Sequence, residues 1–380
     1  MRVGGLIASR LRFKGRMAVL TIAISFLVIT LAVSISDGFR ETIREGIGRM
    51  AGEVVLSGPE GTVSTELSYL DDILELEGVE SLRPVIYCPG IVIKGGELGG
   101  AVFKAYADSG PGSLKAIVPS GLATKLGLTE GDSFLGYFYS GKVRARRFGV
   151  EGLYDSPVQT ASRELVFAEA EDLRRLMGYG PTTATAFELR LSQRYRNAEG
   201  MRRMAAEIAT VCAQNAREDE DVLLAAAASD TYGRIFDWLD LIDFNVLAIL
   251  VLMTLVAGFN MISGLLILLF RSTSTIGLLK ALGMCEGAIA SVFLRAGARI
   301  ALKGLLIGNG IALGLGLVQK WTHLVRLNPA NYFVSYVPIS IDAGKILLTD
   351  VSAFLIIMIL LLLPCLFISK VEPSETLRIR

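Results

Sequence analysis

Four long apolar stretches constrain this 380-residue chain more than any other feature. A helix that crosses a bilayer needs about 20 mainly apolar residues. The stretches that meet this requirement are residues 17–34, 246–270, 301–318 and 346–368. Hydrophobic residues make up 52% of the chain, whereas roughly 45–50% is usual for a soluble domain. The sequence therefore predicts an α-helical membrane protein with four transmembrane helices.

The first stretch follows a basic start, as the apolar core of a secretory signal peptide does. Such a core is about 7–15 residues long, and the run "MAVLTIAISFLVITLAVS" is longer. It continues into "DGFRETIREGIGRM" without a convincing cleavage site. We therefore expect this segment to be retained as a membrane anchor.

Lysine and arginine residues near the ends of the spans predict the orientation, because cytoplasmic loops carry an excess of them. Three segments are basic, namely the first sixteen residues, the segment between the second and third spans, and the C-terminal tail. The loop after the third span carries only Lys320, Arg326 and Lys345. We therefore expect both termini in the cytoplasm and the long insert after the first span on the opposite side.

These inferences give a predicted order of segments along the chain. It comprises a cytoplasmic N-terminus (1–16), a first transmembrane helix (17–37), a large extracytoplasmic domain (38–235), a stalk with the second transmembrane helix (236–270), a cytoplasmic segment (271–295), a third transmembrane helix (296–319), an outer loop (320–345), a fourth transmembrane helix (346–369) and a cytoplasmic tail (370–380).

The large insert has the pattern of an α+β domain. Apolar, β-branched runs such as "EVVLSG", "PVIYCPGIVIKG", "AVFKAYAD" and "FGVEGLYDS", punctuated by Gly, Pro and Asp, are typical of strands. The segment "NAEGMRRMAAEIATVCAQN" has helical periodicity. The stretch "GLATKLGLTEGDSF" predicts a short helix, a tight turn at Gly127 and Gly131, and a new strand. The insert is long enough to form its own core.

The sequence lacks the motifs of nucleotide-binding proteins and of common hydrolases, and it lacks the basic composition of nucleic-acid-binding proteins. There is no G-x-x-x-x-G-K-[ST] phosphate loop, no G-x-S-x-G and no H-E-x-x-H. We therefore expect no catalytic site, and we expect ATP to be hydrolysed by another chain. The net charge is only +1, with no basic stripe, so we expect no nucleic-acid partner.

The thiols and the imidazole do not suggest a metal site. Cys88, Cys212, Cys285 and Cys365 show no C-x-x-C spacing, and His323 is the single histidine. Cys88 and Cys212 could pair on an oxidising side of the membrane or remain separate buried thiols. Both alternatives stay open from the sequence.

Polar and small residues inside the spans indicate packing or a pathway. In the second span, Asn260 and Ser263 lie three residues apart, flanked by Gly258 and Gly264. We favour hydrogen bonding between helices for these two residues and keep the lining of a substrate path as the alternative. Five glycines predict a tightly packed third span: Gly304, Gly308, Gly310, Gly314 and Gly316.

An acidic stripe precedes the second span. Asp237, Asp240 and Asp243 are three residues apart, so they follow one side of a helix. A solvated face is the favoured interpretation, and gating of an entrance beneath the large domain is the alternative.

The cytoplasmic stretch "RSTSTIGLLKALGMCEG" predicts a short amphipathic helix. On a helical wheel, Leu278, Leu279 and Leu282 share one arc, whereas Gly277, Lys280 and Ala281 lie on the other side. Such a helix either rests in the lipid interface or docks on a cytoplasmic motor. Wheel geometry does not distinguish these two roles.

Several motifs resemble those of a known family. The single span, large outer domain and three further spans, with "TIGLLKALGM" and the terminal "VEPSETLRIR", resemble the FtsX-like permeases of ABC transporters. The segments "SISDGFRETI", "VAGFNMISGLLILLF" and "LNPANYFVSYVPI" are most similar to the LolC/LolE lipoprotein-releasing permeases. In the insert, "PSGLATKLGLTEGDSF" and "ELVFAEAEDLRRLM" resemble the MacB-type periplasmic core domain.

The resemblance implies a fold, partners and a coupling helix. The permease domain would cover about 240–376. It implies a separate LolD-like ABC ATPase that binds ATP and Mg, and a second permease chain, in a homodimer or a heterodimer. The coupling helix seated on that ATPase would comprise Ile276, Gly277, Leu278, Leu279, Lys280, Ala281, Leu282 and Gly283. Family members usually carry an acidic residue where this chain has Thr275.

The resemblance also implies a location and a substrate. The expected function is the extraction of lipoproteins from the bacterial inner membrane, in contact with its lipids, and their transfer to a periplasmic carrier. We expect the path between the first two spans, with candidates chosen by position: Ile22, Phe26, Ile29, Val33, Val246, Leu250, Met253 and Ala257. The nearer alternative is a MacB/FtsX-type mechanotransmission permease for peptide or drug export or for cell-wall hydrolase regulation. The more distant alternative is a membrane-anchored receptor or enzyme.

Overall fold

The computed structural model describes residues 16–107, 109, 112–155 and 164–366. These residues form two compact units. The helical unit takes the described residues of Met1–Arg40, Asp240–Arg326 and Tyr336–Arg380, and the sheet unit takes those of Glu41–Leu239 and Leu327–Ser335. The basic N-terminal segment and the cytoplasmic tail of the orientation argument lie outside the described residues.

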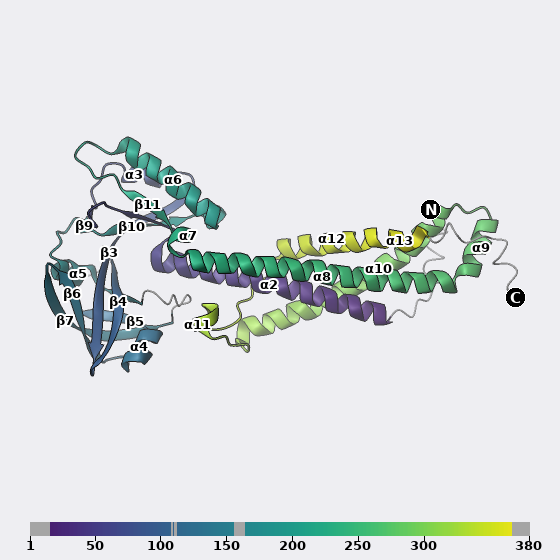
Figure 1. Ribbon diagram of the computed structural model, residues 1–380, viewed down its shortest axis with the longest axis horizontal. Helices are drawn as coiled ribbons and strands as arrows, with labels where there is room; N and C mark the ends of the chain where they lie inside the picture. The colour runs from purple at the N-terminus through teal and green to yellow at the C-terminus, as the bar shows by residue number, and fades with distance from the viewer. Residues whose placement is uncertain (1–15, 108, 110–111, 156–163, 367–380) are drawn as a thin grey trace. The chain divides into compact units, whose positions relative to one another are not determined.

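Four helical segments of the described chain are long and apolar enough to cross a membrane. They are α2 (Arg16–Ala51), α8 (Gly233–Arg271), α10 (Glu286–Thr322), and α12 (Ala343–Leu360) followed by α13 (Leu362–Cys365) (Figure 1). Their most apolar windows have mean hydropathies of 1.7 to 2.8. The prediction of four apolar helices is therefore confirmed.

The two helices that flank the insert extend well beyond their predicted spans. α2 has 36 residues and α8 has 39, so they measure about 54 Å and about 58 Å at 1.5 Å per residue. The hydrocarbon core of a bilayer is only about 30 Å thick. The predicted domain boundary at residue 38 therefore falls inside α2, which ends where Gly52 adopts a positive φ of 68°.

Close helix packing holds the helical unit together. Ile22, Phe26 and Ile29 of α2 are buried in one cluster with side chains from α8, α10 and α12. A Cβ added at Gly308 of α10 would lie 2.4 Å from the Ala23 carbonyl oxygen, so the two backbones approach too closely for a side chain. The tight packing predicted for α10 is confirmed at Gly304 and Gly308. A Cβ at Gly316 would make an ordinary contact with Ile339, and Gly310 and Gly314 face open space.

The sheet unit is built on a nine-stranded mixed sheet of order β11-β1-β10-β3-β4-β8-β5-β7-β6, in which β6 also pairs with β3. A two-stranded sheet joins β2 to β9. The strands are β1 (Val54–Ser57), β2 (Val63–Ser64), β3 (Val79–Lys94), β4 (Glu97–Tyr106), β5 (Lys115–Pro119), β6 (Ser133–Ser140), β7 (Lys142–Tyr154), β8 (Leu165–Ala168), β9 (Thr183–Ala184), β10 (Ala186–Leu191) and β11 (Leu224–Ala227).

Short helices cover parts of this sheet. α3 and α6 pack together beside β11, and α4 and α5 lie against the strands around β4 (Figure 1). The helices are α3 (Leu70–Leu74), α4 (Ser120–Leu126), α5 (Ala170–Met177), η1 (Gln193–Tyr195), α6 (Ala198–Asn215), α7 (Ala228–Thr231) and α11 (Pro329–Tyr332).

An aromatic cluster lies at the centre of the core between β3–β8 and helices α4 and α5. Phe103 lies edge-on to Phe138, with ring centroids 4.7 Å apart, and Phe134 stacks on Phe148 at 5.8 Å. Such pairs add about 0.5–1.5 kcal/mol each to the burial of their area.

The strands and the helix predicted in the insert are confirmed. So is the predicted turn, because Gly127 and Gly131 both take positive φ angles, of 60° and 87°, between α4 and β6. Cys88 and Cys212 are free, buried thiols and do not pair.

Candidate functional site

The predicted coupling helix is present as α9 (Thr273–Ala281), between α8 and α10. Gly283, with a φ of 83°, ends it. The Gly283 amide donates to the Lys280 carbonyl at 2.9 Å, and the Met284 amide donates to the Leu279 carbonyl at 3.0 Å, which together form a Schellman end. α10 begins at Glu286, so the predicted cytoplasmic segment 271–295 includes the start of that long helix.

The three leucines of α9 do not share one face. Leu278 and Leu282 are 52% and 75% exposed, whereas Leu279 packs on the core of the helical unit. Leu279 is about 100° from Leu278 around the helix. It therefore lies next to the side of α9 on which Ile276 is buried, and the predicted arc is divided between two sides. The buried side also holds Gly277.

The exposed face of α9 therefore differs in its residues from the predicted arc of leucines. It consists of Ser274, Thr275, Leu278, Ala281 and Leu282, which repeat at helical spacing. We call these five residues the α9 outer face. Lys280 is not part of it, since its side chain is 11% exposed and pairs with Glu286 at 2.9 Å. Thr275, the departure from the family pattern, lies on the α9 outer face.

The eight substrate-path candidates lie mainly in the packed interior of the helical unit. Ile22, Phe26, Ile29 and Ala257 are buried in the helical core, and Leu250 and Met253 pack against it. Val33 and Val246 are half-buried. The expectation that these parts of α2 and α8 face each other agrees with their shared cluster, and their role in a substrate path stays a prediction.

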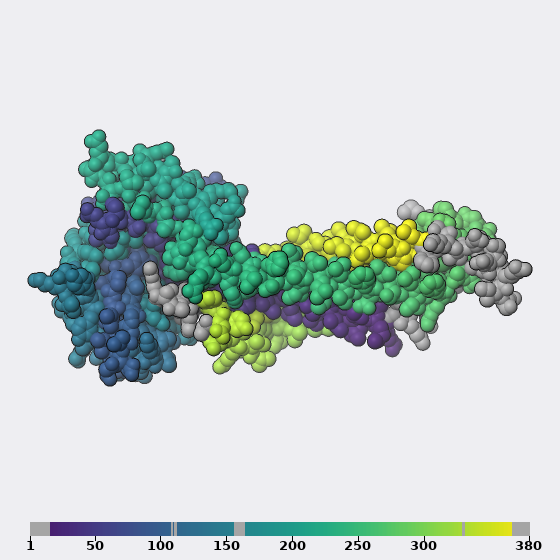
Figure 2. Space-filling model, in the orientation of Figure 1, coloured from purple at the N-terminus to yellow at the C-terminus, as the bar shows by residue number. Residues whose placement is uncertain are grey.

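The exposed apolar side of α8 was missed by the sequence reasoning. Its side chains follow the helix along the surface of the helical unit (Figure 2). The exposed large apolar residues of α8 are Leu241, Phe244, Leu247, Ile249, Val251, Leu252, Leu255, Val256, Phe259, Ile267 and Phe270. Apolar residues surround the membrane-spanning part of α8, so the sequence pattern did not reveal which side faces outwards.

Polar contacts between the spans involve other residues than those predicted. Asn260 and Ser263 are exposed, and the Ser263 hydroxyl donates to the Phe259 carbonyl of its own helix at 3.1 Å. Neither residue is buried between helices of this chain, and their role in hydrogen bonding between helices stays a prediction. Instead, Thr30 of α2 donates to Asn309 of α10 at 2.6 Å, and the Asn309 amide donates to Asp350 of α12.

Asp350 is the notable member of this chain of hydrogen bonds. It is 5% exposed, and its Oδ1 has no hydrogen-bond partner among the described residues. A lone acidic residue in "LLTDVSAFL" was the sequence signal for it, because ionisable residues are rare inside spans.

A second set of polar contacts joins the ends of the spans that lie nearest to the insert. The Ser36 hydroxyl donates to the Asp243 carboxylate at 2.8 Å, and Arg40 pairs with the same carboxylate. Lys345 pairs with Asp37 at 2.6 Å. Asp243 of the acidic stripe thus holds α8 to α2, whereas Asp237 and Asp240 form the solvated face that was favoured.

The strands next to α2 and α8 pair with each other. β1 follows α2, and β11 leads through α7 into α8. The two strands are antiparallel neighbours, with Val54 opposite Ala227 and Ser57 opposite Leu224. The Ala228 amide also donates to the Glu53 carbonyl at 2.9 Å. We call residues 52–54 and 227–228 the helix joint.

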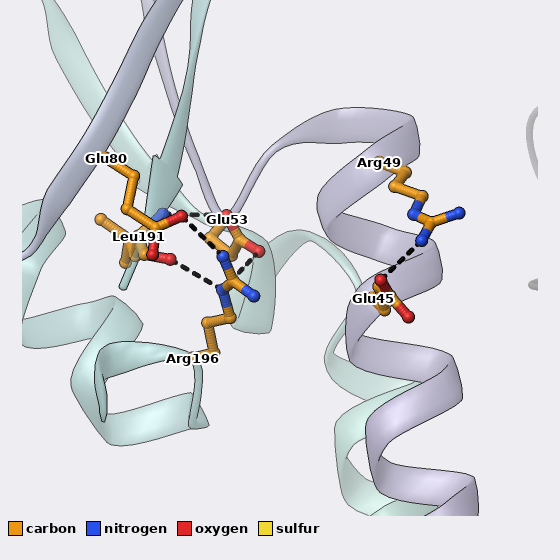
Figure 3. Close-up of polar contacts among 6 residues, drawn as sticks. All are labelled: Glu45, Arg49, Glu53, Glu80, Leu191 and Arg196. Atoms are coloured by element: carbon orange, nitrogen blue, oxygen red, sulfur yellow. Dashed lines mark hydrogen bonds and ion pairs between the residues drawn. The ribbon is translucent and has the colours of Figure 1, made fainter. Parts of the chain in front are cut away.

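A buried carboxylate lies in the helix joint. The Glu53 side chain is 1% exposed, accepts from the Leu191 amide at 3.0 Å and lies 3.4 Å from Arg196 (Figure 3). Arg196 also pairs with Glu80 at 2.9 Å. Burial raises the pKa of Glu53 above its usual 4.5, and the Leu191 hydrogen bond and Arg196 oppose this rise.

A buried lysine holds the last turn of α2. Lys104 is fully buried and donates to the Met50 carbonyl at 2.6 Å and to Glu188 at 2.8 Å. A cation at a helix C-terminus offsets the partial negative charge there. Burial lowers the pKa of Lys104, and the Glu188 carboxylate opposes that change. The end of α2 is thereby fixed to β4 and β10.

Comparison with known proteins finds one matching family and several relatives of similar length. Residues 247–373 match the profile of the FtsX-like permease C-terminal family. The chain is 23% identical to "Lipoprotein-releasing system transmembrane protein LolC" of Neisseria meningitidis serogroup B, over 94% of this chain and 92% of that protein. It is 21% identical to the protein of the same name from Xylella fastidiosa strain 9a5c, over 95% and 92%.

Two solved extracytoplasmic domains show a loose likeness at 10% identity. The extracellular domain of the transporter YknZ from Gram-positive bacteria gives a TM-score of 0.30, covering 46% of this chain and 98% of that one. The periplasmic region of MacB from Actinobacillus actinomycetemcomitans gives 0.29, covering 50% and 95%.

The C-terminal part of the chain, residues 247–373, resembles an FtsX-like permease domain. The class of protein that the chain resembles is therefore a permease. Along nearly its whole length the chain is similar to LolC permeases.

Proposed function

We propose that this chain is an inner-membrane permease subunit that extracts lipoproteins for transfer to a periplasmic carrier, powered by a separate ATPase. The observation that carries the mechanical part is the helix joint. α2 and α8 each continue from an apolar span into the sheet unit, and β1–β11 pairing ties their ends together. A displacement of the two spans is then delivered to the sheet at one point.

The α9 outer face is the proposed contact with the ATPase. Leu278 and Leu282 present apolar surface on a short helix whose other side is anchored by Ile276 and Leu279. A partner that moves α9 also moves α8 and α10, which are connected to it through short turns. In the proposed orientation α9 lies in the cytoplasm and the sheet unit in the periplasm.

External work is needed because an acylated substrate is held by its chains, at about 0.8 kcal/mol per buried CH₂. We place the apolar path along the exposed side of α8, with Leu241, Phe244 and Leu247 nearest the sheet unit in sequence. A second permease chain would cover this side. The relatives' names support a lipoprotein as the substrate.

Depletion of the protein tests the proposal. We expect lipoproteins of the outer membrane to accumulate in the inner membrane, as measured by membrane fractionation and immunoblotting. Wild-type protein should restore the distribution, and a Leu278→Asp variant made at the same level should not. An unchanged distribution on depletion would reject lipoprotein release and favour mechanotransmission without lipoprotein transport.

A further inference from the structure

A small pocket in the sheet unit is surrounded by basic side chains. Its volume is about 220 Å³, and it lies where the last turns of α2 meet β3, β4 and β10. The residues that line it are Gly48, Arg49, Arg83, Tyr106, Glu188 and Arg190.

Two of the arginines are placed by the register of the sheet. Arg83 of β3 lies directly opposite Glu188 of β10, and Arg190 follows two positions later on the same face of β10. The Arg83 guanidinium carbon lies 4.9 Å from the centre of the Tyr106 ring, which holds it over that ring. The arginines therefore converge from neighbouring strands.

The carboxylate that lines the pocket is already satisfied. Glu188 is 4% exposed and accepts hydrogen bonds from Lys104, at 2.8 Å, and from the Tyr87 hydroxyl. Lys104 also caps the α2 carboxyl end through the Met50 carbonyl. The Glu188 carboxylate and the helix end thus share Lys104 as a partner.

Arg190 has one buried donor without an acceptor in the described part of the chain, although its charge also interacts with Glu53. Its Nε is buried without a hydrogen-bond partner among the described residues. A buried donor left unpaired is unfavourable, and the planar guanidinium fork matches the oxygens of a phosphate group. Arg49 lies at the open edge, since its side chain is 66% exposed and pairs with Glu45 at 2.6 Å (Figure 3).

We propose that this pocket binds an oxyanion of the phosphate class, held by Arg190 and Arg83 and approached by Arg49. A free phosphate and the phosphate of a lipid headgroup share this chemistry. The bound group would connect α2 to β3 and β10. The site is independent of what the permease transports, so its test is a binding measurement.

The full-length protein in a phosphate-free maltoside detergent is titrated with inorganic phosphate at constant ionic strength, using chloride as the reference salt. We expect a saturable rise in the unfolding temperature that chloride does not produce. Arg190→Gln should weaken binding at least about tenfold, which is about 1.4 kcal/mol. The matched control is Arg175→Gln, because Arg175 is 70% exposed and outside the pocket.

Arg83→Gln provides a second variant at a more exposed position in case Arg190→Gln does not fold. No saturable response of the wild type, or equal binding by the wild type and the folded pocket variant, would overturn the proposal. Short-chain phosphatidylglycerol below its micelle concentration identifies the source. Tighter binding of the lipid than of phosphate indicates a headgroup, and the reverse indicates a soluble anion.

Discussion

The carbonyl oxygen of Glu53 accepts a hydrogen bond of 2.9 Å from the amide of Ala228. These residues are far apart in the sequence, yet one follows α2 and the other begins α7, which leads into α8. The contact continues the β1–β11 ladder towards the helices. The helix joint therefore fixes the distance between the two helix ends by backbone hydrogen bonds, which side-chain substitutions leave in place.

Loss of the lysine beside the helix joint should destabilise the sheet unit. Lys104→Met removes the cation from buried Glu188 and leaves the Met50 carbonyl without its donor. Breaking a buried pair on one side costs about 3–5 kcal/mol. Thermal unfolding of the full-length protein should show this loss, whereas Lys115→Met, at an exposed pair with Glu151, should change little. A second substitution, Glu188→Leu, should recover part of the loss.

The two sides of α9 should respond differently to a negative charge. Leu278→Asp and Leu282→Asp should abolish co-purification of the ATPase while the permease remains folded, because both side chains are exposed. Leu279→Asp should instead lower the yield of folded protein, since Leu279 packs on the helical core. Gly287→Asp is the control, as it adds the same charge where a Cβ meets open space. Retained ATPase binding by both outer-face variants would contradict the proposed contact.

Two glycines of α10 provide a matched test of helix packing. Gly308→Leu should destabilise the helical unit by about 1–3 kcal/mol through overpacking, because its Cβ would lie 2.4 Å from the Ala23 carbonyl oxygen. Gly310→Leu should be tolerated, since nothing lies within 4 Å of its added Cβ. Unfolding temperatures in detergent measure both. Equal stability of the two variants would show that α2 and α10 do not pack as described.

Asp350 should be replaceable by its amide and not by a hydrocarbon. Asp350→Asn retains an oxygen that can accept from Asn309, whereas Asp350→Leu leaves the Asn309 amide unpaired at a cost of about 1–3 kcal/mol. Ser352→Leu is the control on the exposed side of α12, because the Ser352 hydroxyl bonds its own helix. Thermal unfolding should rank Asp350→Leu below the other two variants.

Glu53 should make stability depend on pH. Burial raises its pKa in the folded state above 4.5, so the folded protein binds the proton more readily than the unfolded chain. Its contribution to the free energy of unfolding is therefore fully present below about pH 4.5 and is lost as the pH rises through the folded pKa. Glu53→Gln should remove this component from the stability profile. Glu60→Gln, at an exposed position, should not. Identical profiles of the wild type and Glu53→Gln would contradict the assignment.

The elements that depend on local pattern could be predicted from the sequence. The four apolar helices follow from length and hydropathy, and the turn at Gly127 and Gly131 follows from the residues that tolerate positive φ. The sides of the helices could not be predicted in the same way. Leu279 turns inwards and Phe26 is core because of what packs against them, and the part of α8 after Asp243 is apolar on all sides.

Contacts between residues far apart in the chain could not be predicted from the sequence either. The pairing of Val54 with Ala227 joins strands at opposite ends of the insert, and no local pattern encodes it. The arginine pocket likewise depends on the register between β3 and β10. Asp350 carried a signal, as an acid in an apolar span, but its partner Asn309 on α10, and the Thr30 hydroxyl that donates to Asn309, became evident only from the packing.

The pairing of β1 with β11 has a consequence for how this architecture varies. The insert begins and ends in two adjacent strands, β1 and β11. The segment between Ser57 and Leu224 therefore starts and finishes at the same place in the sheet. This segment can become longer or shorter, or be replaced, without a change in the distance between the ends of α2 and α8. The same helical unit can thus carry different outer domains, whether these arise in evolution or are grafted at this pair of strands.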